Sequence, residues 1–239
     1  MNKQQLENIW EQAKSIKEDE ALQWLVRQTH TRTNHARMLV GAEEGAFLEL
    51  FVQQVKAQRV LELGTFTGYS AIRLARGGAH VDAVEINDEL EDLIRNGFER
   101  AGATDKIDLH FTDAKIFLKE LHEQIKLADT TVGNKKLYDI VFIDANKREY
   151  PEYYSLVFPL VKEGGYILAD NVLWSGKLEE ALQKQEAQEI KTEEIKPDIL
   201  KLDAQTSGIV EFYLTAKNDQ RVEFITLPIR DGLSIIRKK

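Results

Sequence analysis

Short apolar segments recur along the chain and alternate with amphipathic stretches. Several of these segments are apolar on both faces, as buried parallel strands are. Five are expected to be strands: Arg59–Leu63, His80–Glu85, Ile107–Phe111, Asp139–Ile143 and Gly165–Ala169. Between them, Ser70–Arg76 and Asp88–Arg95 carry helical patterns. This alternation predicts an α/β fold with a mostly parallel sheet and helices on both faces.

A second apolar pattern closes the chain. After a long polar interval, Arg221–Leu227 and Leu233–Arg237 are apolar runs of strand length. They flank Pro228–Gly232, in which the Asp-Gly step is a turn signal. Strands joined by so short a turn pair in antiparallel fashion, so the sheet is expected to end in an antiparallel last strand.

Two segments stand outside this alternation. Residues 1–57 have apolar positions at helical spacing, which predicts an N-terminal helical cap over a sheet edge or a pocket mouth. Residues 178–201 are rich in Glu, Lys and Gln, as in a solvated loop or an exposed helix, and we treat residues 178–208 as a charged insertion. With 239 residues, 43% of them hydrophobic, residues 1–239 are expected to form a single domain.

Composition narrows the partners and the compartment. The 40 acidic and 32 basic residues give a net charge of −8 with no Lys/Arg block, so nucleic acid is not an expected partner. The chain has no cysteine, which excludes disulfides, thiolate catalysis and sulfur-bound zinc. The first residues are polar, and no apolar run reaches the roughly 18 residues of a membrane span. A soluble cytoplasmic protein without a membrane segment is expected.

Oxygen-donor side chains follow two of the predicted strands. Asp144-Ala-Asn-Lys147 comes after one apolar run, and Asp170-Asn171 comes after another. Ligands bind at the carboxyl ends of strands in open α/β sheets, so these oxygen donors can converge beside the amine of Lys147. Such a set is typical of a hard-cation site with a base next to it. Taken alone, Asp170-Asn171 would equally fit an Asx turn, and Lys147 a surface lysine.

The turn after the first strand contains two glycines. Gly64 and Gly68 allow close backbone approach to a ligand, and the helix that opens near Ser70 directs its first amides at an anionic group. Phe66 occupies the place of the second glycine of the dinucleotide pattern, which favours a carboxylate over a pyrophosphate. Glu85 ends the second strand, where an acid meets ribose hydroxyls in nucleotide folds. The glycine turn and Glu85 together indicate an adenosine-bearing ligand without a diphosphate. A turn with glycines between a strand and a helix is also common without any ligand.

Six short motifs follow one another along the chain: Val60–Ser70, Ala83–Glu85, Asp113–Ala114, Phe142–Lys147, Asp170–Gly176 and Leu227–Gly232. In this order they resemble the cation-dependent S-adenosylmethionine O-methyltransferases, which include catechol and caffeoyl-CoA O-methyltransferases and many bacterial relatives. The resemblance implies the Rossmann-like class I methyltransferase fold. That fold has a seven-stranded, mostly parallel sheet with an antiparallel last strand.

The resemblance also implies a site for S-adenosylmethionine. Its expected contacts are Val40, Glu62, Gly64, Ser70, Glu85, Asp113, Ala114 and Asp144. Ser70 is expected near the methionine carboxylate and Glu85 at the ribose. Asp113 and Ala114 are expected beside the adenine.

By the same resemblance, a divalent cation (Mg²⁺, Mn²⁺ or Ca²⁺) is held by Asp144, Asp170 and Asn171. Lys147 corresponds to the catalytic base, and Asp144 serves both the cofactor and the cation. Met38 and Trp174 are expected to border the methyl acceptor. The family relationship also implies a homodimer with the N-terminal helices near its interface.

The acceptor is where the chain departs from the family. Residues 178–208 are longer and more charged than expected, and the aromatic acceptor-binding residues of the plant CoA-ester enzymes have no match there. An acidic chain does not favour a highly anionic CoA ester either. We therefore expect a small aromatic acceptor with catechol-like or vicinal hydroxyls, with a caffeoyl-type ester as the second choice.

Three other interpretations stay open. A metal-independent transferase of the same fold would use the glycine turn and Glu85 without the cation ligands. A nicotinamide dehydrogenase would need the glycine that Phe66 replaces. A non-catalytic cofactor-binding protein would keep the fold and would need neither the cation ligands nor Lys147.

Overall fold

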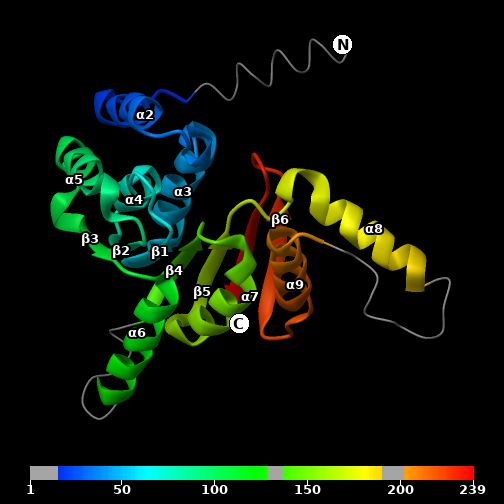
Figure 1. Cartoon of the computed structure of the whole chain (residues 1–239). Helices are drawn as coiled ribbons and strands as arrows, with labels where there is room; N and C mark the ends of the chain where they lie inside the picture. The colour runs from blue at the N-terminus through cyan, green and yellow to red at the C-terminus, as the bar shows by residue number, and fades with distance from the viewer. Residues whose placement is uncertain (1–15, 129–136, 190–201) are drawn as a thin grey trace.

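The protein is built around one seven-stranded sheet with the strand order β3-β2-β1-β4-β5-β7-β6 (Figure 1). The computed structural model describes residues 16–128, 137–189 and 202–239. Its strands are β1 (Arg59–Leu63), β2 (His80–Glu85), β3 (Ile107–Phe111), β4 (Tyr138–Ile143), β5 (Val161–Ala169), β6 (Val222–Leu227) and β7 (Leu233–Lys238).

Strands β1 to β5 are parallel, and β7 pairs in antiparallel fashion with both β5 and β6. The chain steps from β1 outward to β2 and β3 and then crosses back to β4 on the other side of β1. A topological switch point therefore lies between β1 and β4. The predicted fold class, including the antiparallel last strand, is confirmed.

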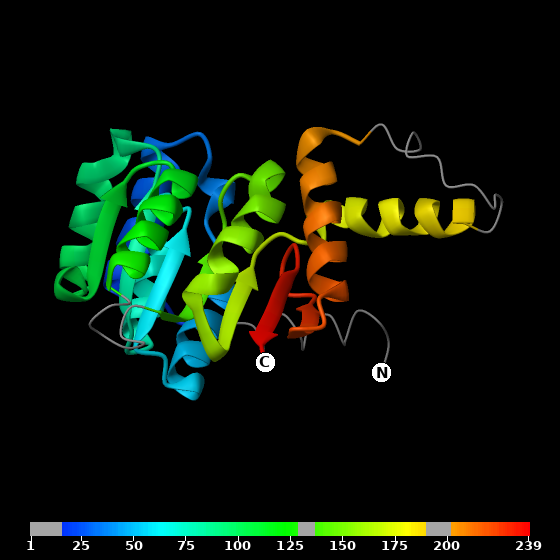
Figure 2. The same ribbon diagram turned by 90° about the horizontal axis from the view of Figure 1, so that it is seen from below.

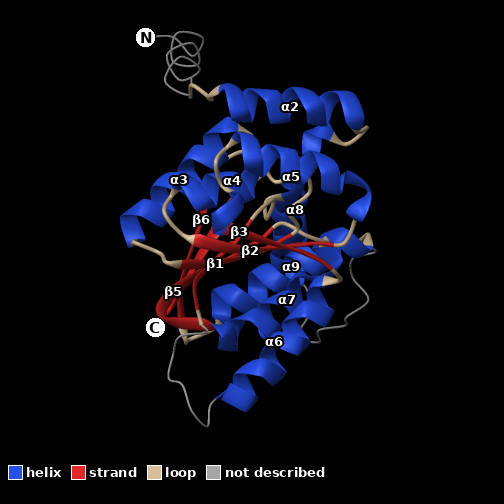
Figure 3. Cartoon of the chain, turned by 90° about the vertical axis from the view of Figure 1, so that its left-hand side faces the viewer, coloured by secondary structure: helices blue, strands red, loops and turns tan. Residues whose placement is uncertain are grey.

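Helices cover both faces of the sheet (Figure 3). One face carries α2 (Glu20–Arg32), α3 (Ala42–Val55), α4 (Tyr69–Arg76) and α5 (Glu91–Arg100). The other carries α6 (Ala114–Ala128), α7 (Tyr150–Val157) and α9 (Ala204–Asn218). Short 3₁₀ turns complete the connections: η1 (Ala36–Met38), η2 (Asp88–Leu90), η3 (Thr104–Lys106), η4 (Lys147–Glu149), η5 (Phe158–Leu160) and η6 (Trp174–Gly176).

The N-terminal helices lie on other helices more than on the sheet. α2 begins at the N-cap Asp19, whose side chain accepts from the Leu22 amide, and it contacts α4 and α5. Leu22 and Leu25 are completely buried there, and Gly97 of α5 lets Leu25 approach closely. Within the predicted cap of residues 1–57, residues 20–32, 36–38 and 42–55 are helical, and residues 1–15 lie outside the described residues.

Most predicted strands begin and end within one residue of the observed ones. β5 is the exception, since it starts at Val161, four residues before the predicted Gly165. Gly164 lies there at φ 75°. A pattern search that treats a Gly-Gly pair as a turn therefore cuts this strand short.

The long polar interval before β6 contains a helix that the sequence analysis did not predict. Residues 204–208, placed in the charged insertion, open helix α9, which Asp203 caps by accepting from the amides of Gln205 and Thr206. Ile209, Phe212 and Ala216 of this helix are completely buried. Their helical spacing was a readable signal, obscured by the polar residues that surround them.

Helix α8 (Lys177–Glu189) extends away from the sheet beyond α9 (Figure 2). The sequence predicted a solvated loop or an exposed helix over residues 178–201, and residues 177–189 are helical. Residues 190–201, like the segment 129–136 after α6, lie outside the described residues. Within the described part of the chain, no helix combines the length and the apolar character that crossing a membrane requires.

Removing the Phe212 ring should test how much the packing of α9 contributes to the stability of the fold. Its ring meets Tyr150 and Tyr154 edge-on, with centroids 5.5 and 5.9 Å away. Phe212→Ala should therefore lower the free energy of unfolding by about 3 to 5 kcal/mol, measured by urea denaturation. Glu211→Ala, an exposed change on the same helix, should alter it by less than about 0.5 kcal/mol. Equal effects of the two changes would contradict this packing.

Candidate active site

The predicted site residues gather at the carboxyl ends of four neighbouring strands. Gly64 follows β1, Glu85 ends β2, Asp144 follows β4 and Asp170 follows β5. These strands flank the switch point, the place at which open α/β sheets bind their ligands. The sequence motifs, far apart along the chain, are thus brought to one edge of the sheet.

Gly64 joins the first loop to the fourth strand. It has φ 93°, which favours glycine, and a Cβ at this position would lie 2.2 Å from the carbonyl oxygen of Asp144. The Gly64 amide donates to the Val84 carbonyl at 2.9 Å. Gly68 has φ 90° and immediately precedes α4. The turn therefore needs these glycines for its conformation and for its close approach to Asp144.

Glu85 is fixed by backbone donors. Its Oε2 accepts from the amide of Phe66 at 2.7 Å, and its Oε1 accepts from the amides of Ile86 and Asn87 at 2.9 Å. Phe66 itself has φ 51°, a left-handed conformation. The carboxylate is thus held at this sheet edge and ties the glycine turn to the end of β2.

Glu62 and Ser70 lie below the glycine turn and are both buried. Glu62 is completely buried, accepts from the Thr65 hydroxyl at 2.8 Å, and has no partner for Oε1 among the described residues. Burial raises the pKa of Glu62 to about 7, against the lowering effect of the Ser70 and Thr65 hydroxyls. This carboxyl is set to receive a donor at this sheet edge.

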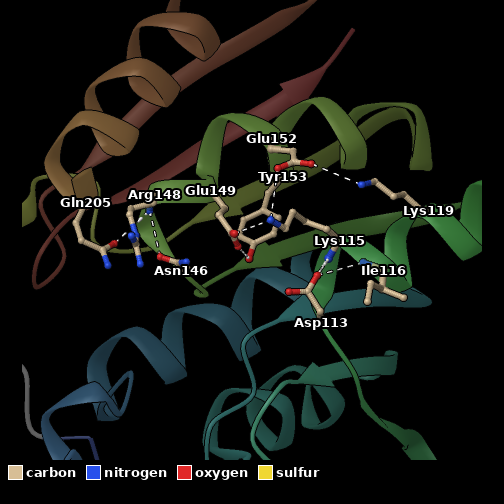
Figure 4. Close-up of polar contacts among 10 residues, drawn as sticks. All are labelled: Asp113, Lys115, Ile116, Lys119, Asn146, Arg148, Glu149, Glu152, Tyr153 and Gln205. Atoms are coloured by element: carbon tan, nitrogen blue, oxygen red, sulfur yellow. Dashed lines mark hydrogen bonds and ion pairs between the residues drawn. The ribbon is translucent and has the colours of Figure 1, made fainter. Parts of the chain in front are cut away.

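Asp113 and Ala114 begin α6 next to β3. Asp113 accepts from the amides of Lys115 and Ile116 at 2.8 and 3.2 Å, so its side chain caps the helix (Figure 4). Lys115 reaches from this helix to Glu149 at 2.6 Å. The pair of residues expected beside the adenine thus lies on a rigid helix start.

Lys147 is buried between an acid and a phenol. Its Nζ donates to Asp144 Oδ1 at 2.6 Å and to the Tyr150 hydroxyl at 2.7 Å. The residue is only 7% exposed, so it is not a surface lysine. The Tyr150 hydroxyl lies 3.0 Å from the Ile143 carbonyl oxygen and 3.1 Å from that of Asp170. The phenol therefore links the ends of β4 and β5 to the ammonium group.

Asp170 and Asn171 follow at the end of β5. Asp170 is 2% exposed, and its Oδ1 accepts from the amide of Asn171 at 2.5 Å. This bond is a short Asx-type contact, and Asn171 takes the left-handed conformation with φ 59°. Burial and the charge of Asp144 raise the pKa of Asp170. The turn and a ligand role are compatible here, because Asp170 Oδ2 makes none of these contacts.

A third carboxyl group reaches the same place from α3. Glu44 is completely buried, and neither of its oxygens has a donor among the described residues. Burial and the neighbouring Asp170 raise the pKa of Glu44, whereas the charge of Arg230 lowers it. The two carboxyls can share a hydrogen bond once one of them is protonated. Three carboxyl groups, Glu44, Asp144 and Asp170, therefore lie here beside two cations, Lys147 and Arg230, and the raised pKa of Glu44 favours its neutral form.

The donor set fits a hard cation. Asp144, Asp170 and Asn171 offer oxygen atoms only, the ligands that Mg²⁺, Mn²⁺ and Ca²⁺ take. Within residues 16–128, 137–189 and 202–239, no three His, Cys, Asp or Glu side chains stand in metal-binding geometry. A site at this place therefore depends on the amide of Asn171 as well as on the two carboxylates.

Two further loops carry predicted site residues. Val40 is 3% exposed in the segment before α3, whereas Met38 is 54% exposed two residues earlier. Trp174 and Ser175 lie beyond β5 with φ 49° and 54°, and the Trp174 indole N–H has no partner among the described residues. Trp174 packs partly buried against the α7 side of the core, so the structure favours packing for much of its ring.

Helix α9 supports the turn that carries Lys147. Gly208 lies so close to this turn that a Cβ would stand 2.4 Å from the Lys147 carbonyl oxygen. The Gln205 side chain accepts from the Arg148 amide at 3.1 Å, and Asn146 accepts from the same amide at 3.4 Å (Figure 4). Helix α9, which sequence inspection missed, therefore packs directly against the turn that contains Lys147.

Comparison with known proteins places the chain in a family. A model of the O-methyltransferase family matches residues 12–239. The chain belongs to this family. It is 30% identical over 217 residues to a probable caffeoyl-CoA O-methyltransferase 2 of Dictyostelium discoideum, which covers 90% of this chain and 83% of that protein. It is 32% identical to caffeoyl-CoA O-methyltransferase 1 of Arabidopsis thaliana over 84% of this chain and 71% of that one.

Solved structures resemble this O-methyltransferase over nearly its whole length. An O-methyltransferase of Bacillus cereus, solved with SAH, is 26% identical with a TM-score of 0.74, covering 94% of this chain and 93% of that chain. An O-methyltransferase of tomaymycin synthesis from Streptomyces achromogenes, solved with SAM, has a TM-score of 0.78 at 24% identity and full coverage of both chains. The second likeness concerns the fold alone.

Sequence inspection missed two residues of the candidate site. Tyr150 stands three positions after Lys147, a helical spacing that brings the two side chains together. Glu44 lies in the acidic first turn of α3, which as a sequence is typical of a solvated helix start. Only the packing of α3 shows that this carboxyl group points inward.

The buried Glu62 should leave a signature in the pH dependence of stability. Its folded pKa of about 7 lies above the ordinary value of 4.5, so the folded state holds this proton more tightly and loses stability as pH rises through that window. Glu62→Gln should be more stable relative to wild type at pH 8 than at pH 4.5, by as much as about 3 kcal/mol. Urea unfolding of both proteins with chelator present measures this difference.

The exposed Glu99→Gln is the matched control and should give a flat difference over the same range. A flat difference for Glu62→Gln as well would show that burial does not raise the pKa of this carboxyl.

Proposed function

We propose that this O-methyltransferase transfers a methyl group from S-adenosylmethionine to a small aromatic acceptor with adjacent hydroxyls, and that a divalent cation is required. The observation that carries the proposal is that Asp144 and Asp170 meet the buried Lys147 and Tyr150 at the carboxyl ends of β4 and β5, with Asn171 as the next residue along the chain. A metal-independent transferase would have no need of this set. The proposal therefore rests on the chemistry of one sheet edge.

The glycine turn and its neighbours supply the proposed cofactor site. Ser70 at the start of α4 offers a hydroxyl and helix amides to the methionine carboxylate, and Glu85 offers its free lone pairs to the ribose. Glu62, with one oxygen lacking a donor, faces the methionine end. The SAM and SAH of the two solved relatives support this assignment.

The residues that would hold the cation are Asp144, Asp170 and Asn171. A divalent cation bound there would act as a Lewis acid that stabilises the acceptor as a phenolate and orients its two adjacent oxygens. The excess of buried carboxyl groups, including Glu44, is the feature of this structure that favours a bound cation.

Lys147 is the proposed base. Its Nζ, as the deprotonated neutral amine, would take the hydroxyl proton of the acceptor and become the ammonium, and its bonds to Asp144 and Tyr150 hold it in place before the acceptor arrives. The acceptor oxygen then attacks the methyl carbon in line with the sulfonium, and the C–S bond breaks to leave S-adenosylhomocysteine. Such a displacement needs the oxygen held roughly 3 Å from the methyl carbon.

Two narrower assignments remain predictions from the sequence. The acceptor class rests on the acidic chain and the unmatched insertion, and the names of the plant relatives keep a caffeoyl-type ester as the alternative. A homodimer and a cytoplasmic location rest on family resemblance and composition. A solution mass of one chain would contradict the homodimer.

Methyl transfer from labelled S-adenosylmethionine to a panel of catechols and caffeoyl esters tests the proposed reaction. Product should form with Mg²⁺ or Mn²⁺ and fall at least a hundredfold with EDTA. Product that is insensitive to EDTA would favour the metal-independent alternative. Lys147→Ala should lower kcat by about 10²-fold or more, whereas the exposed Arg148→Ala should retain wild-type turnover.

The proposed division of labour predicts opposite effects for two acids. Asp170→Ala should abolish metal-dependent turnover and leave the Kd for S-adenosylmethionine within about threefold, because the cofactor contacts lie mainly on other loops. Glu85→Ala should weaken cofactor binding by about tenfold or more, since it loses a ribose hydrogen bond to a charged group. Calorimetric titration of each variant measures both Kd values. Equal losses would refute the division.

A further inference from the structure

The turn between β6 and β7 contacts two segments that carry predicted site residues, and we call these two segments walls. One wall is the segment 38–41, which precedes α3 and contains Val40. The other is the segment 171–176, which follows β5 and contains Asn171 and Trp174. The residues of this turn belong to the last of the six sequence motifs, Leu227–Gly232.

Arg230 makes the contact to the first wall. Its Nη1 donates to the carbonyl oxygen of Leu39 at 2.6 Å and also to that of Val40. Leu39 and Val40 are 8% and 3% exposed, so their carbonyls have little access to water. A Cβ on Gly41 would lie 3.3 Å from the guanidinium, so the glycine leaves room for it. Arg230 thus satisfies two buried acceptors at once.

The following residues make the contact to the second wall. The Asp231 side chain accepts from the Ser175 amide at 2.6 Å, and its carbonyl accepts from the Leu173 amide at 2.8 Å. The Gly232 carbonyl accepts from the Val172 amide at 3.0 Å. A Cβ on Gly232 would stand 2.3 Å from Leu173 Cγ. The turn is therefore in direct contact with the loop that begins at Asn171.

The backbone at Arg230 is left-handed, with φ 50°. A residue other than glycine is disfavoured there, by roughly 1 kcal/mol or more. The conformation aims the guanidinium at the segment 38–41, and its charge also lies close enough to Glu44 to lower the pKa of that carboxyl. Glycine at position 230 would adopt this backbone conformation without strain, but it would lose the bonds to the segment 38–41 and the charge near Glu44.

We propose that Arg230 is a positioning residue: it fixes the backbone of Leu39 and Val40 so that this segment presents a preformed wall to the methyl donor. The proposal rests on the proposed function, in which Val40 lines the cofactor. Its basis is the two carbonyl contacts, the burial of those carbonyls and the anchoring of the same turn on the opposite wall.

Arg230→Gly tests the proposal without straining the backbone, because glycine prefers the left-handed conformation. Lys56→Gly is the matched control: Lys56 is an exposed residue with φ 56° at the end of α3, and its replacement also removes one positive charge. Hydrogen exchange of the Leu39 and Gly45 amides and the Kd for S-adenosylmethionine are measured on the full chain. The two amides donate to Ala36 and Gly41 carbonyls, at the two ends of the segment.

Arg230→Gly should accelerate exchange of these amides at least tenfold and raise the Kd at least tenfold, whereas Lys56→Gly should change each by less than twofold. Arg230→Lys, which restores one donor, should lie between wild type and Arg230→Gly, and it serves as the test if the glycine variant does not fold. Unchanged exchange, or faster exchange with an unchanged Kd, would overturn the proposal. If the wild-type protein binds no S-adenosylmethionine, the proposed function is wrong. The hydrogen-exchange comparison would still show whether Arg230 orders the segment 38–41.

Discussion

Negative charge buried at one edge of the sheet constrains the surrounding structure. Glu44, Asp144 and Asp170 approach one another where water is largely excluded, and like charges in such surroundings oppose ionisation. An unpaired buried charge costs several kcal/mol, so the protein must bring cations and hydrogen-bond donors to this place. Lys147 comes from the β4 end and Arg230 from the β6–β7 turn, which explains why segments so distant along the chain meet here.

Close backbone contacts keep these elements in register. Gly64 brings the glycine turn against Asp144, Gly208 brings α9 against Lys147, and Gly232 brings the last hairpin against Leu173. At each position a Cβ would come within 2.4 Å of a neighbouring heavy atom, well inside van der Waals contact. The candidate site is thus assembled from loops that touch one another directly and cannot shift independently.

The sheet could be predicted from sequence because its strands are apolar and bounded by clear turn signals, as Arg59–Leu63 and His80–Glu85 illustrate. The acids after β4 and β5 could be predicted for the same reason, since strand ends are fixed by the strands. Helix α9 was missed because its buried residues, such as Phe212, lie among polar ones. Glu44 was missed because the direction of a side chain in a first helical turn depends on what the helix packs against. Lys147 could be placed at the site, and Tyr150 stands at helical spacing from it, but the complete burial of Tyr150 follows from tertiary packing.

Helices α8 and α9 begin next to each other, although their first residues are far apart in the sequence. Lys177 at the start of α8 and Asp203 at the start of α9 form an ion pair at 3.0 Å, so the starts of these two helices lie side by side. A loop closed at its base can change length at a small entropic cost, roughly 0.6 kcal/mol for each doubling. Leu178 and Ala181 of α8 are each 2% exposed, so a foreign module grafted between α8 and α9 would have to leave the first two turns of α8 in place.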